Sequence, residues 1–336
     1  MASATLSAAP LPRFVAGSVW NRDISAAPLD PNSATMISTL QGLGGWGNGN
    51  AFQIDFGIVV LHATDSDPTQ PVVAWPSAAG YYSPDCEAPG LAFPLPSGGA
   101  IEGSPGYSCN HASDDCHLLV VRGRSLFEAY AATVTSAGVE ARCALRWDLD
   151  KIYPPEGRGE HCTSADGAGF PIAALLFNAD EVAAAIPANG DLGHAIRFVL
   201  PNDRIAASRY VHPSTHGTTT VGPLASVPYG VRMRLLASFD MSAYNAAAKV
   251  ILRTMQRFGI VLSDGGNIAL TAEDDRFNTH TWDSLGIDSH TFNPGTGSPP
   301  VQVTDFEVVD TGPQRDVTFN CTRVADDFVF IDHMEF

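Results

Sequence analysis

The sequence predicts a mainly β fold, a β-sandwich or jelly-roll-like architecture with one well-formed helix at about residues 242–258. Short apolar runs of strand length recur along the chain, and turn residues separate them. Glycine and proline account for 31 and 24 of the 336 residues, whereas charged residues make up only 16%, which is typical of a loop-rich β protein. Many short strands with one helix indicate sheets packed face to face.

No internal repeat, low-complexity tract or clear linker divides the chain. We expect residues 1–17 to form an N-terminal arm and residues 18–336 to form a single β-rich domain. A chain of this length is long enough to bury one large hydrophobic core.

The first half of the chain is predicted to hold short strands between long loops. A short helix is expected within residues 30–43, and one or two strands are expected over 52–63. Residues 64–116 are rich in Pro, Gly and Ser, and a loop of this length is functional or pinned by disulfides. Residues 117–134 predict a β-hairpin, because two apolar runs flank a glycine-containing turn. Alternating apolar and polar side chains predict a half-buried strand over 144–150.

The second half adds strands on both sides of the helix. A capping-box pattern predicts a short helix over residues 178–185, and strands are expected over 194–200 and 231–240. Residues 260–270 predict a second hairpin, which turns at the Asp-Gly-Gly-Asn sequence. Residues 301–336 return to short strands.

The helix at 242–258 has recognisable ends and one apolar face. Ser242 is a suitable N-cap, and Gly259 is a suitable residue to follow the last turn. The apolar face repeats at helical spacing and consists of Val250, Ile251, Met255 and Phe258.

The composition excludes several classes of function. Asp and Glu outnumber Lys and Arg by 36 to 19, and the net charge of −17 opposes binding to nucleic acid or anionic membranes. No apolar run approaches the roughly 18 residues of a membrane-spanning helix. The motifs of common serine hydrolases, zinc proteases, nucleotide enzymes and dinucleotide oxidoreductases are missing. No cofactor is predicted; a divalent metal is left open, with the acidic run 271–280 as one calcium candidate.

Six cysteines without a C-x-x-C pair indicate disulfides rather than a zinc or redox site. Cys109 and Cys116 bracket a polar loop and are expected to form a local bridge, while Cys143 and Cys162 are expected to close the next long loop. Three disulfides indicate an extracellular, secreted protein, because the cytosol keeps thiols reduced. The alternative is a cytosolic protein with scattered buried thiols.

Chemistry is predicted to concentrate between residues 163 and 216. Short strand-like runs there begin or end in an ionisable side chain, and strand ends are where a rigid scaffold aims side chains into a common cleft. This pattern selects Asp166, His194, Arg197, His212 and His216.

Carboxylates beside apolar runs or tight turns are candidate catalytic groups. Glu102, Glu128, Asp166 and Asp240 occupy such places, and two carboxyl groups across a sugar act as acid and base or as acid and nucleophile. Glu128 has apolar neighbours, where burial would raise its pKa and suit the role of an acid. The alternative for each is an ordinary structural or surface carboxylate.

Histidine and arginine side chains complete the candidate site. His117 opens a predicted strand, and with His194, His216 and a carboxylate it is a candidate metal ligand; a hydrogen-bonded structural histidine is the commoner case. Arg197 and Arg234 alternate with apolar neighbours, which suits binding of a carboxylate, orientation of sugar hydroxyls, or structural salt bridges.

Several segments spread over residues 18–311 carry a resemblance: SVWNRDIS, IEG, HLLVV with LFEAY, TSADGAGFPI, HAIRF, PSTH, RMRLLASFD, ILRTMQRFGIVLSDGGN and DFEVVDT. With these segments the chain resembles a poorly characterised family of secreted bacterial and fungal proteins that is associated with carbohydrate. Two places depart from the pattern: Leu236 stands where the relatives carry Lys, and IALTAEDD replaces an aromatic-rich segment. The resemblance implies as site residues Glu102, His117, Glu128, Asp166, His194, Arg197, His216, Arg234 and Asp264.

These observations predict a secreted carbohydrate-active enzyme that acts on a polysaccharide or oligosaccharide. The first hypothesis is a glycoside hydrolase with Glu128 or Glu102 as the acid and Asp166 as its partner. The second is a polysaccharide lyase, in which His or Tyr abstracts a proton and Arg neutralises a uronate. The third is a non-catalytic protein, either a carbohydrate-binding module or an extracellular structural or filament subunit. For the hydrolase, the substrate-binding residues are His117, His194, Arg197, His216, Arg234 and Asp264.

Overall fold

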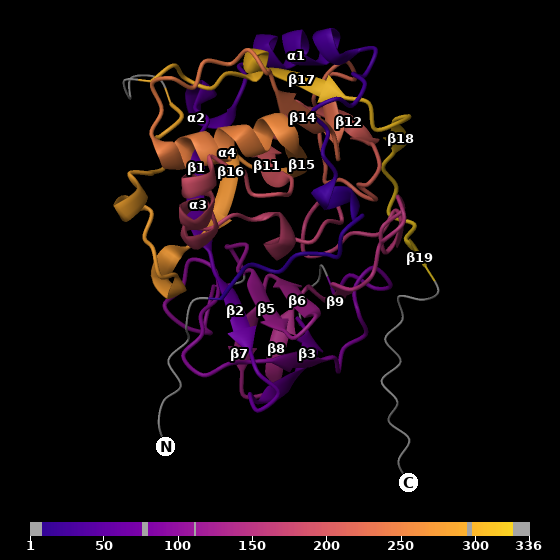
Figure 1. Cartoon of the computed structure of the whole chain (residues 1–336). Helices are drawn as coiled ribbons and strands as arrows, with labels where there is room; N and C mark the ends of the chain where they lie inside the picture. Colours follow the sequence, from indigo (N-terminus) through magenta and orange to yellow (C-terminus); the bar gives the residue numbers. More distant parts are fainter. Residues whose placement is uncertain (1–8, 76–79, 111, 294–297, 325–336) are drawn as a thin grey trace.

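A computed structural model describes residues 9–75, 80–110, 112–293 and 298–324. The protein is mainly β, with several sheets and few helices, as predicted. A six-stranded sheet with its helices forms one part of the molecule, and two four-stranded sheets form the other (Figure 1). Residues 1–8 of the predicted arm lie outside the described ranges, and Leu11 and Phe14 from its remainder are buried in the core.

The six-stranded sheet has the order β1 (Ile54–Ile58), β16 (Leu270–Glu273), β11 (Ile196–Leu200), β15 (Ile260–Gly265), β14 (Arg232–Leu235) and β17 (Phe306–Val309). The pairs β1–β16 and β11–β15 are parallel, whereas β15–β14 and β14–β17 are antiparallel. A jelly roll is antiparallel throughout, so that part of the prediction is not confirmed. β11 is buried over its whole length, as expected for a central strand covered on both faces.

The predicted hairpin over residues 260–270 is wrong. β15 and β16 follow one another in the chain, but β11 lies between them and pairs with both. The turn after Asp264 therefore spans a strand instead of closing a hairpin. The Gly and Asn residues after Asp264 do form a bend, as predicted. However, the buried apolar strand β11 lies between β15 and β16, so these two strands do not pair with each other.

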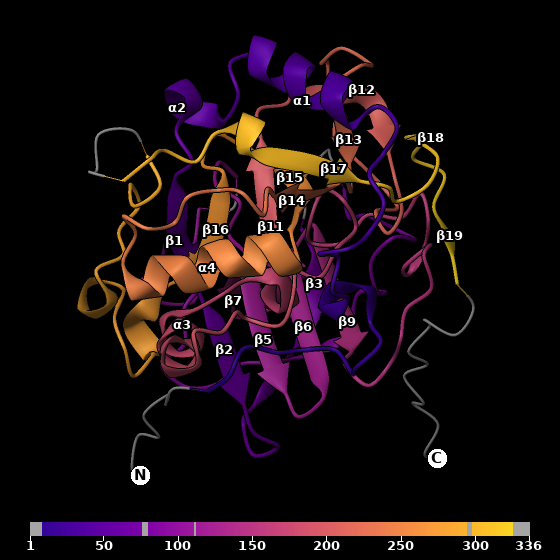
Figure 2. The same cartoon turned by 45° about the horizontal axis from the view of Figure 1, so that its top comes forward.

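The predicted helix is α4 (Ala246–Arg257), which lies across one face of the six-stranded sheet (Figure 2). It begins later than expected, because the side chain of Asn245, and not that of Ser242, accepts the capping hydrogen bond. Gly259 follows the last turn with a φ of +72°, a conformation that favours glycine.

The described residues contain three further α-helical segments, so α4 is not the single helix. The short helix expected within 30–43 is α1 (Ser33–Gly42), which packs beside β17 (Figure 2). The side chain of Asn178 caps α3, as predicted, by accepting a hydrogen bond of 2.8 Å from the backbone N–H of Glu181. The other two helices are α2, which spans Gly47–Asn50, and α3, which spans Ala179–Ala185.

The second part of the molecule contains two four-stranded sheets. One has the order β2 (Val60–Ala63), β5 (Leu118–Arg122), β6 (Ser125–Tyr130) and β9 (Cys143–Asp148). The other has the order β4 (Ala92–Pro94), β3 (Thr69–Ala74), β8 (Gly138–Ala141) and β7 (Thr133–Thr135). β5 and β6 pair antiparallel and confirm the hairpin predicted within residues 117–134.

The sheet of β2, β5, β6 and β9 is buried on both faces. Leu118 and Val120 of β5 pack in a core shared with β3 and β8, while Leu119 and Val121 face the main core of the molecule. Successive side chains of a strand point to opposite faces, so one strand supplies both cores. This sheet therefore links the two parts of the molecule.

Three disulfides cross-link the described residues. Cys109–Cys116 is the local bridge that the sequence predicts. The predicted bridge between Cys143 and Cys162 is wrong, because the fold brings each of them close to a different cysteine. The observed pairs are Cys86–Cys143 and Cys162–Cys321.

The Cys162–Cys321 bridge fixes the last described segment to the body of the protein. Next to it, β10 (Gly159–Glu160) pairs with β19 (Thr322–Arg323). The remaining sheet has the order β13 (Val227–Tyr229), β12 (Ile205–Tyr210) and β18 (Arg315–Asp316). Among the described helices, none is both long and apolar enough to cross a membrane.

Candidate active site

A cleft with a volume of about 510 Å³ is lined by residues from both parts of the molecule. His117 enters it just before β5, Tyr130 from the end of β6, and Asp264 from the end of β15. Strand ends therefore supply only part of its polar groups, and Asp166 and His216, which the sequence places at strand ends, lie in loops. The other lining residues come mainly from loops and are Tyr81, Tyr82, Ser83, Asp85, Asp115, Thr163, Ser164, Ala165, Asp166, Gly167, His216, Thr218, Thr219, Gly265 and Phe319.

Asp166 lies in the wall of the cleft in an ion pair with Arg197. The Arg197 Nη2 donates to Asp166 Oδ1 at 2.7 Å, and Nη1 donates to Thr271 at 3.0 Å. The Asp166 side chain has no exposed surface. Burial raises the pKa of Asp166 to about 7; Arg197 opposes this shift, and the charge of Asp264 adds to it. Asp166 thus holds the wall and is coupled electrostatically to Asp264.

Asp264 presents a partly exposed carboxylate to the cleft. The backbone N–H of Gly167 donates to its Oδ2 at 2.9 Å, and that of Gly265 donates to its Oδ1 at 2.7 Å. A Cβ atom at Gly167 would lie 2.6 Å from Asp264 Oδ1, so this close approach requires glycine. Two backbone donors therefore fix the orientation of the Asp264 carboxylate.

His117 is held as a cation at the back of the cleft. Its Nδ1 bonds Glu102 Oε2 at 2.7 Å, and its Nε2 bonds the carbonyl oxygen of Ala165 at 3.1 Å. Both partners only accept, so the ring satisfies both when both nitrogens carry a proton. Burial opposes protonation, but the charge and hydrogen bond of Glu102 prevail and raise the pKa of His117 to about 9.

Asp115 reaches the cleft from the disulfide loop at its exposed rim. The Cys109–Cys116 bridge closes this loop, and the carbonyl oxygens of Asp115 and Cys116 accept hydrogen bonds from the chain that follows β6. Desolvation raises the pKa of Asp115; the charge of His117 opposes the shift, and the charges of Glu102 and Asp264 add to it. Asp115 is therefore a solvent-accessible carboxyl group whose pKa is raised in part by the charge of Asp264.

Aromatic rings line the cleft beside these carboxyl groups. Tyr82 and Tyr130 stack with centroids 6.3 Å apart, and the ring of His117 lies 5.6 Å from that of Tyr130. His216 packs edge-on against Phe319 at 5.3 Å. Such surfaces suit the apolar faces of sugar rings.

His216 is a neutral histidine in the cleft wall. Its Nδ1 lies 3.1 Å from the carbonyl oxygen of Gly167, so in the neutral ring Nδ1 carries the proton and Nε2 is an acceptor. Burial lowers the pKa of His216. This state suits proton acceptance or a hydrogen bond from a substrate hydroxyl.

The structure brings six of the nine predicted site residues together. His117, Asp166, His216 and Asp264 line the cleft. Glu102 and Arg197 lie directly behind it, bonded to His117 and Asp166 respectively. The three that lie elsewhere are Glu128, His194 and Arg234.

Glu128 is completely buried away from the cleft and anchors a turn. Its Oε1 accepts hydrogen bonds of 2.8 Å from the backbone N–H groups of Ile172 and Ala173, and its Oε2 accepts one of 2.8 Å from Trp147. Burial raises the pKa of Glu128 to about 7, as expected for a carboxyl group in the core.

His194 and Arg234 are also outside the cleft. His194 is buried before β11, its Nδ1 contacts the carbonyl oxygen of Ala195 at 2.8 Å, and burial lowers its pKa strongly. Arg234 pairs with Glu307 on the neighbouring strand β17. Arg234 therefore forms a structural salt bridge on a sheet face, which was the alternative to a binding role.

Sequence reasoning missed several residues of the cleft. Asp115 had a local signal, because it stands next to Cys116 in the predicted disulfide loop. Asp85 and Phe319 had no such signal, since they come from loops that only the folded chain brings together.

Metal ligation finds little support among the described residues. Their single cluster of three ligand-type side chains is Cys109, Asp114 and Cys116, and both cysteines are in a disulfide. In the acidic run, Glu273 accepts from Asn178 at 2.8 Å and Asp274 caps a short turn. Those carboxylates therefore already have protein partners.

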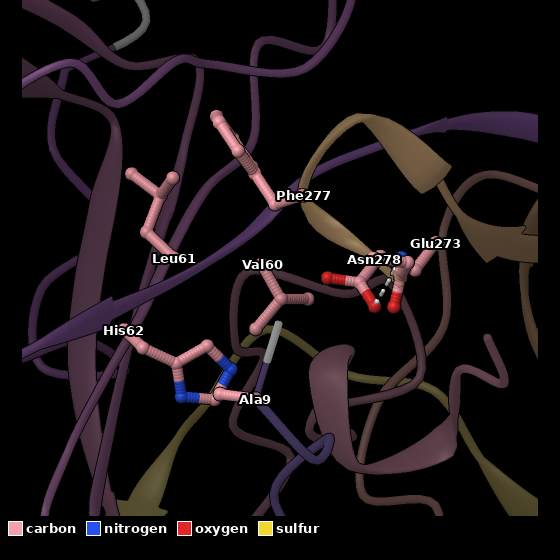
Figure 3. A pocket seen from close by; sticks show the side chains of 7 residues that line it. All are labelled: Ala9, Val60, Leu61, His62, Glu273, Phe277 and Asn278. Carbon is pink, nitrogen blue, oxygen red and sulfur yellow. Dashed lines mark hydrogen bonds between the residues drawn. The ribbon is translucent and has the colours of Figure 1, made fainter. Parts of the chain in front are cut away.

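A second, much smaller hollow lies beside β2 and β16 (Figure 3). Its volume is about 10 Å³, which is near the lower limit for one water molecule. Asn278 points toward Glu273 there and donates a hydrogen bond of 3.5 Å. Burial raises the pKa of Glu273 to about 7. The hollow is too small for a substrate. The large cleft is the candidate site because it gathers six of the predicted site residues in or directly behind its wall.

Comparison with known proteins leaves the geometry as the basis for a functional assignment. No protein-family model, curated protein or solved structure matches this chain. The resemblance inferred from sequence segments therefore remains an expectation.

Proposed function

We propose that the protein is a secreted glycoside hydrolase that cleaves a neutral glycan in the large cleft. One observation carries this proposal: Asp115 and Asp264 are solvent-accessible carboxyl groups that line the same cleft. Desolvation raises the pKa of Asp115, and the charges of Glu102 and Asp264 add to the shift. Acid–base glycoside hydrolysis uses a pair of carboxyl groups, one as the acid and one as the base, and the aromatic rings beside them suit a bound sugar.

In this mechanism Asp115 is the general acid and Asp264 the general base. Asp115 donates its proton to the glycosidic oxygen as the bond from that oxygen to the anomeric carbon breaks. Asp264 removes a proton from the water that attacks the anomeric carbon. The raised pKa of Asp115 suits the acid, and the two backbone donors on Asp264 fix the position of the base.

This assignment revises the expected roles of three other carboxylates. The oxygens of Glu128 are occupied by core donors, Glu102 serves His117, and Asp166 has no exposed side-chain surface. We assign Asp166 as a positioning residue, because it lies next to Gly167, whose N–H binds Asp264.

The charge of the cleft favours a neutral substrate. Asp85, Asp115 and Asp264 line it with carboxyl groups, and His117 is its one cationic lining residue within the described parts of the chain. The whole protein carries −17. A polyanionic glycan would meet repulsion in such a field. The three disulfides support secretion into an oxidising compartment.

The test is turnover of a panel of neutral and acidic polysaccharides by single-carboxyl variants. We expect Asp115→Asn and Asp264→Asn each to lower kcat/KM by a factor on the order of 10² or more, because each removes one proton-transfer step. Asp240→Asn is the matched control, since Asp240 is exposed, accepts a backbone hydrogen bond and lies outside the cleft. Full activity in a folded Asp264→Asn variant would remove Asp264 from the mechanism.

A polysaccharide lyase is the second candidate, and His117 favours it. The imidazolium of His117 would neutralise a uronate carboxylate in the cleft. His216 or Tyr130, which line the same cleft, would abstract the proton. The products decide between the two: hydrolysis adds water to the fragments, whereas elimination leaves a double bond at the new end. Glycans that bind but stay intact would support a carbohydrate-binding protein instead.

A further inference from the structure

Another cavity, with a volume of about 350 Å³, shares no lining residue with the large cleft or with the small hollow. Its walls are mostly apolar and include Trp20, Ile152 and Val261. Two cationic side chains, Arg22 and Arg232, line the same space. This volume lies within the range of small-ligand sites, which combine apolar walls with a few polar anchors.

Arg232 is a buried cation without a carboxylate partner. It is 4% exposed and donates to three backbone carbonyl oxygens, those of Phe258 at 2.8 Å, Val19 at 2.8 Å and Arg22 at 3.0 Å. Within the described ranges, no carboxylate oxygen lies within 4.0 Å of the guanidinium of Arg232 or of Arg22. A guanidinium has five N–H donors, so the three carbonyls leave part of its capacity for a ligand.

The electrostatic surroundings of Arg232 favour an anion. Burial and the like charge of Arg22 lower the pKa of Arg232 to about 9, and Asp23 opposes this only in part. The other ionisable side chains of the cavity are Asp310 and His212, and His212 Nε2 already bonds Glu160 Oε2 at 3.0 Å. An anion between the two arginines would pair with the buried charge of Arg232, because unpaired buried charge is costly, and would also lie beside the exposed charge of Arg22.

We propose that this cavity binds a small apolar monocarboxylate. The carboxylate lies between Arg22 and Arg232, and the apolar part packs against Trp20, Ile152 and Val261. A planar guanidinium binds a carboxylate through paired N–H donors, which a neutral head group does not match. The site is distinct from the proposed hydrolase cleft, so it concerns an additional ligand and not the glycan.

The first experiment is calorimetric titration of the full chain with octanoate and, separately, with 1-octanol. Octanoate is expected to bind with a Kd of about 1 mM or tighter, as a ligand of about ten non-hydrogen atoms allows. 1-Octanol has the same tail without the charge, and we expect it to bind at least roughly tenfold more weakly, since a charge-assisted hydrogen bond is lost. Equal binding of both, or binding of neither, would overturn the proposal.

Variants locate the carboxylate. Arg22→Gln is expected to weaken octanoate binding roughly tenfold and to leave binding of 1-octanol unchanged. Arg124→Gln is the control, because Arg124 is also surface-exposed but pairs with Asp150 outside this cavity. If the two variants bind octanoate equally well, the anion does not lie at Arg22. Arg232→Lys, checked for folding by circular dichroism, is expected to weaken binding further because it loses the planar fork.

Discussion

At the level of single residues, two charged side chains in the cleft wall are each paired with a residue of opposite charge behind the wall. His117 and Asp166 lie in the wall, and Glu102 and Arg197 stand directly behind them as counter-ions. Each inner group fixes the orientation of its outer partner and favours the charged form of that partner. Asp264 is held differently, by backbone donors that carry no net charge.

The Glu102–His117 pair makes stability depend on pH. The pKa of His117 is raised to about 9 in the folded protein from an ordinary value of 6.5, so its contribution is complete below pH 6.5 and is lost as pH rises toward 9. We expect wild-type stability in urea to fall over this window. In Glu102→Gln the fall should be smaller, and the variant should be less stable at pH 6 by about 3 kcal/mol. Parallel pH profiles would show that the pair contributes nothing of this kind.

At the scale of elements, Glu128 of β6 supports the turn η2 (Ala173–Leu175) that leads toward α3. Its carboxylate accepts three hydrogen bonds, whereas the amide of Gln has only one accepting oxygen. Glu128→Gln therefore places an N–H group against another donor.

We expect Glu128→Gln to lower the free energy of unfolding by about 2 kcal/mol, measured in urea, because a buried donor loses its partner. Turnover by the remaining folded protein should change little. Loss of turnover at unchanged stability would instead return Glu128 to the catalytic role that the sequence suggested.

The sequence predicted those elements that depend on local pattern, and it named some of the residues that line the cleft. β5, β6 and α4 follow from apolar periodicity, and the position of His117 follows from the start of an apolar run, whereas Asp264 was implied by the resemblance alone. The role of Glu128 could not be predicted, because its partners lie 19 to 45 residues away in the chain. The position of β11 between β15 and β16 was missed for the same reason: strand order is a long-range property.

At the scale of the whole molecule, disulfides of very different span hold the cleft together. Cys109–Cys116 is separated by 7 residues and shapes the loop of Asp115, whereas Cys162–Cys321 is separated by 159 and holds the segment that brings Phe319 to the cleft. Only the short bridge was predictable, since its partners are neighbours in sequence.

Removal of the long bridge by Cys162→Ser with Cys321→Ser should cost about 5 kcal/mol of stability if chain entropy dominates. Removal of the short bridge by Cys109→Ser with Cys116→Ser should cost about 2 kcal/mol by the same relation. Chemical denaturation of both double variants measures the difference. Equal losses would mean that strain or residual structure, and not loop length, sets the contribution of these bridges.

Hydrolysis of a neutral glycan by Asp264 and Asp115 is tested by mass spectrometry of the products. The wild-type protein and the Asp264→Asn variant are each incubated with the polysaccharide panel. We expect wild type to release fragments of a neutral glycan that carry added water, and the variant to release none above background. Intact glycans with folded wild-type protein would rule out hydrolysis in the cleft, and so would fragments with unsaturated ends.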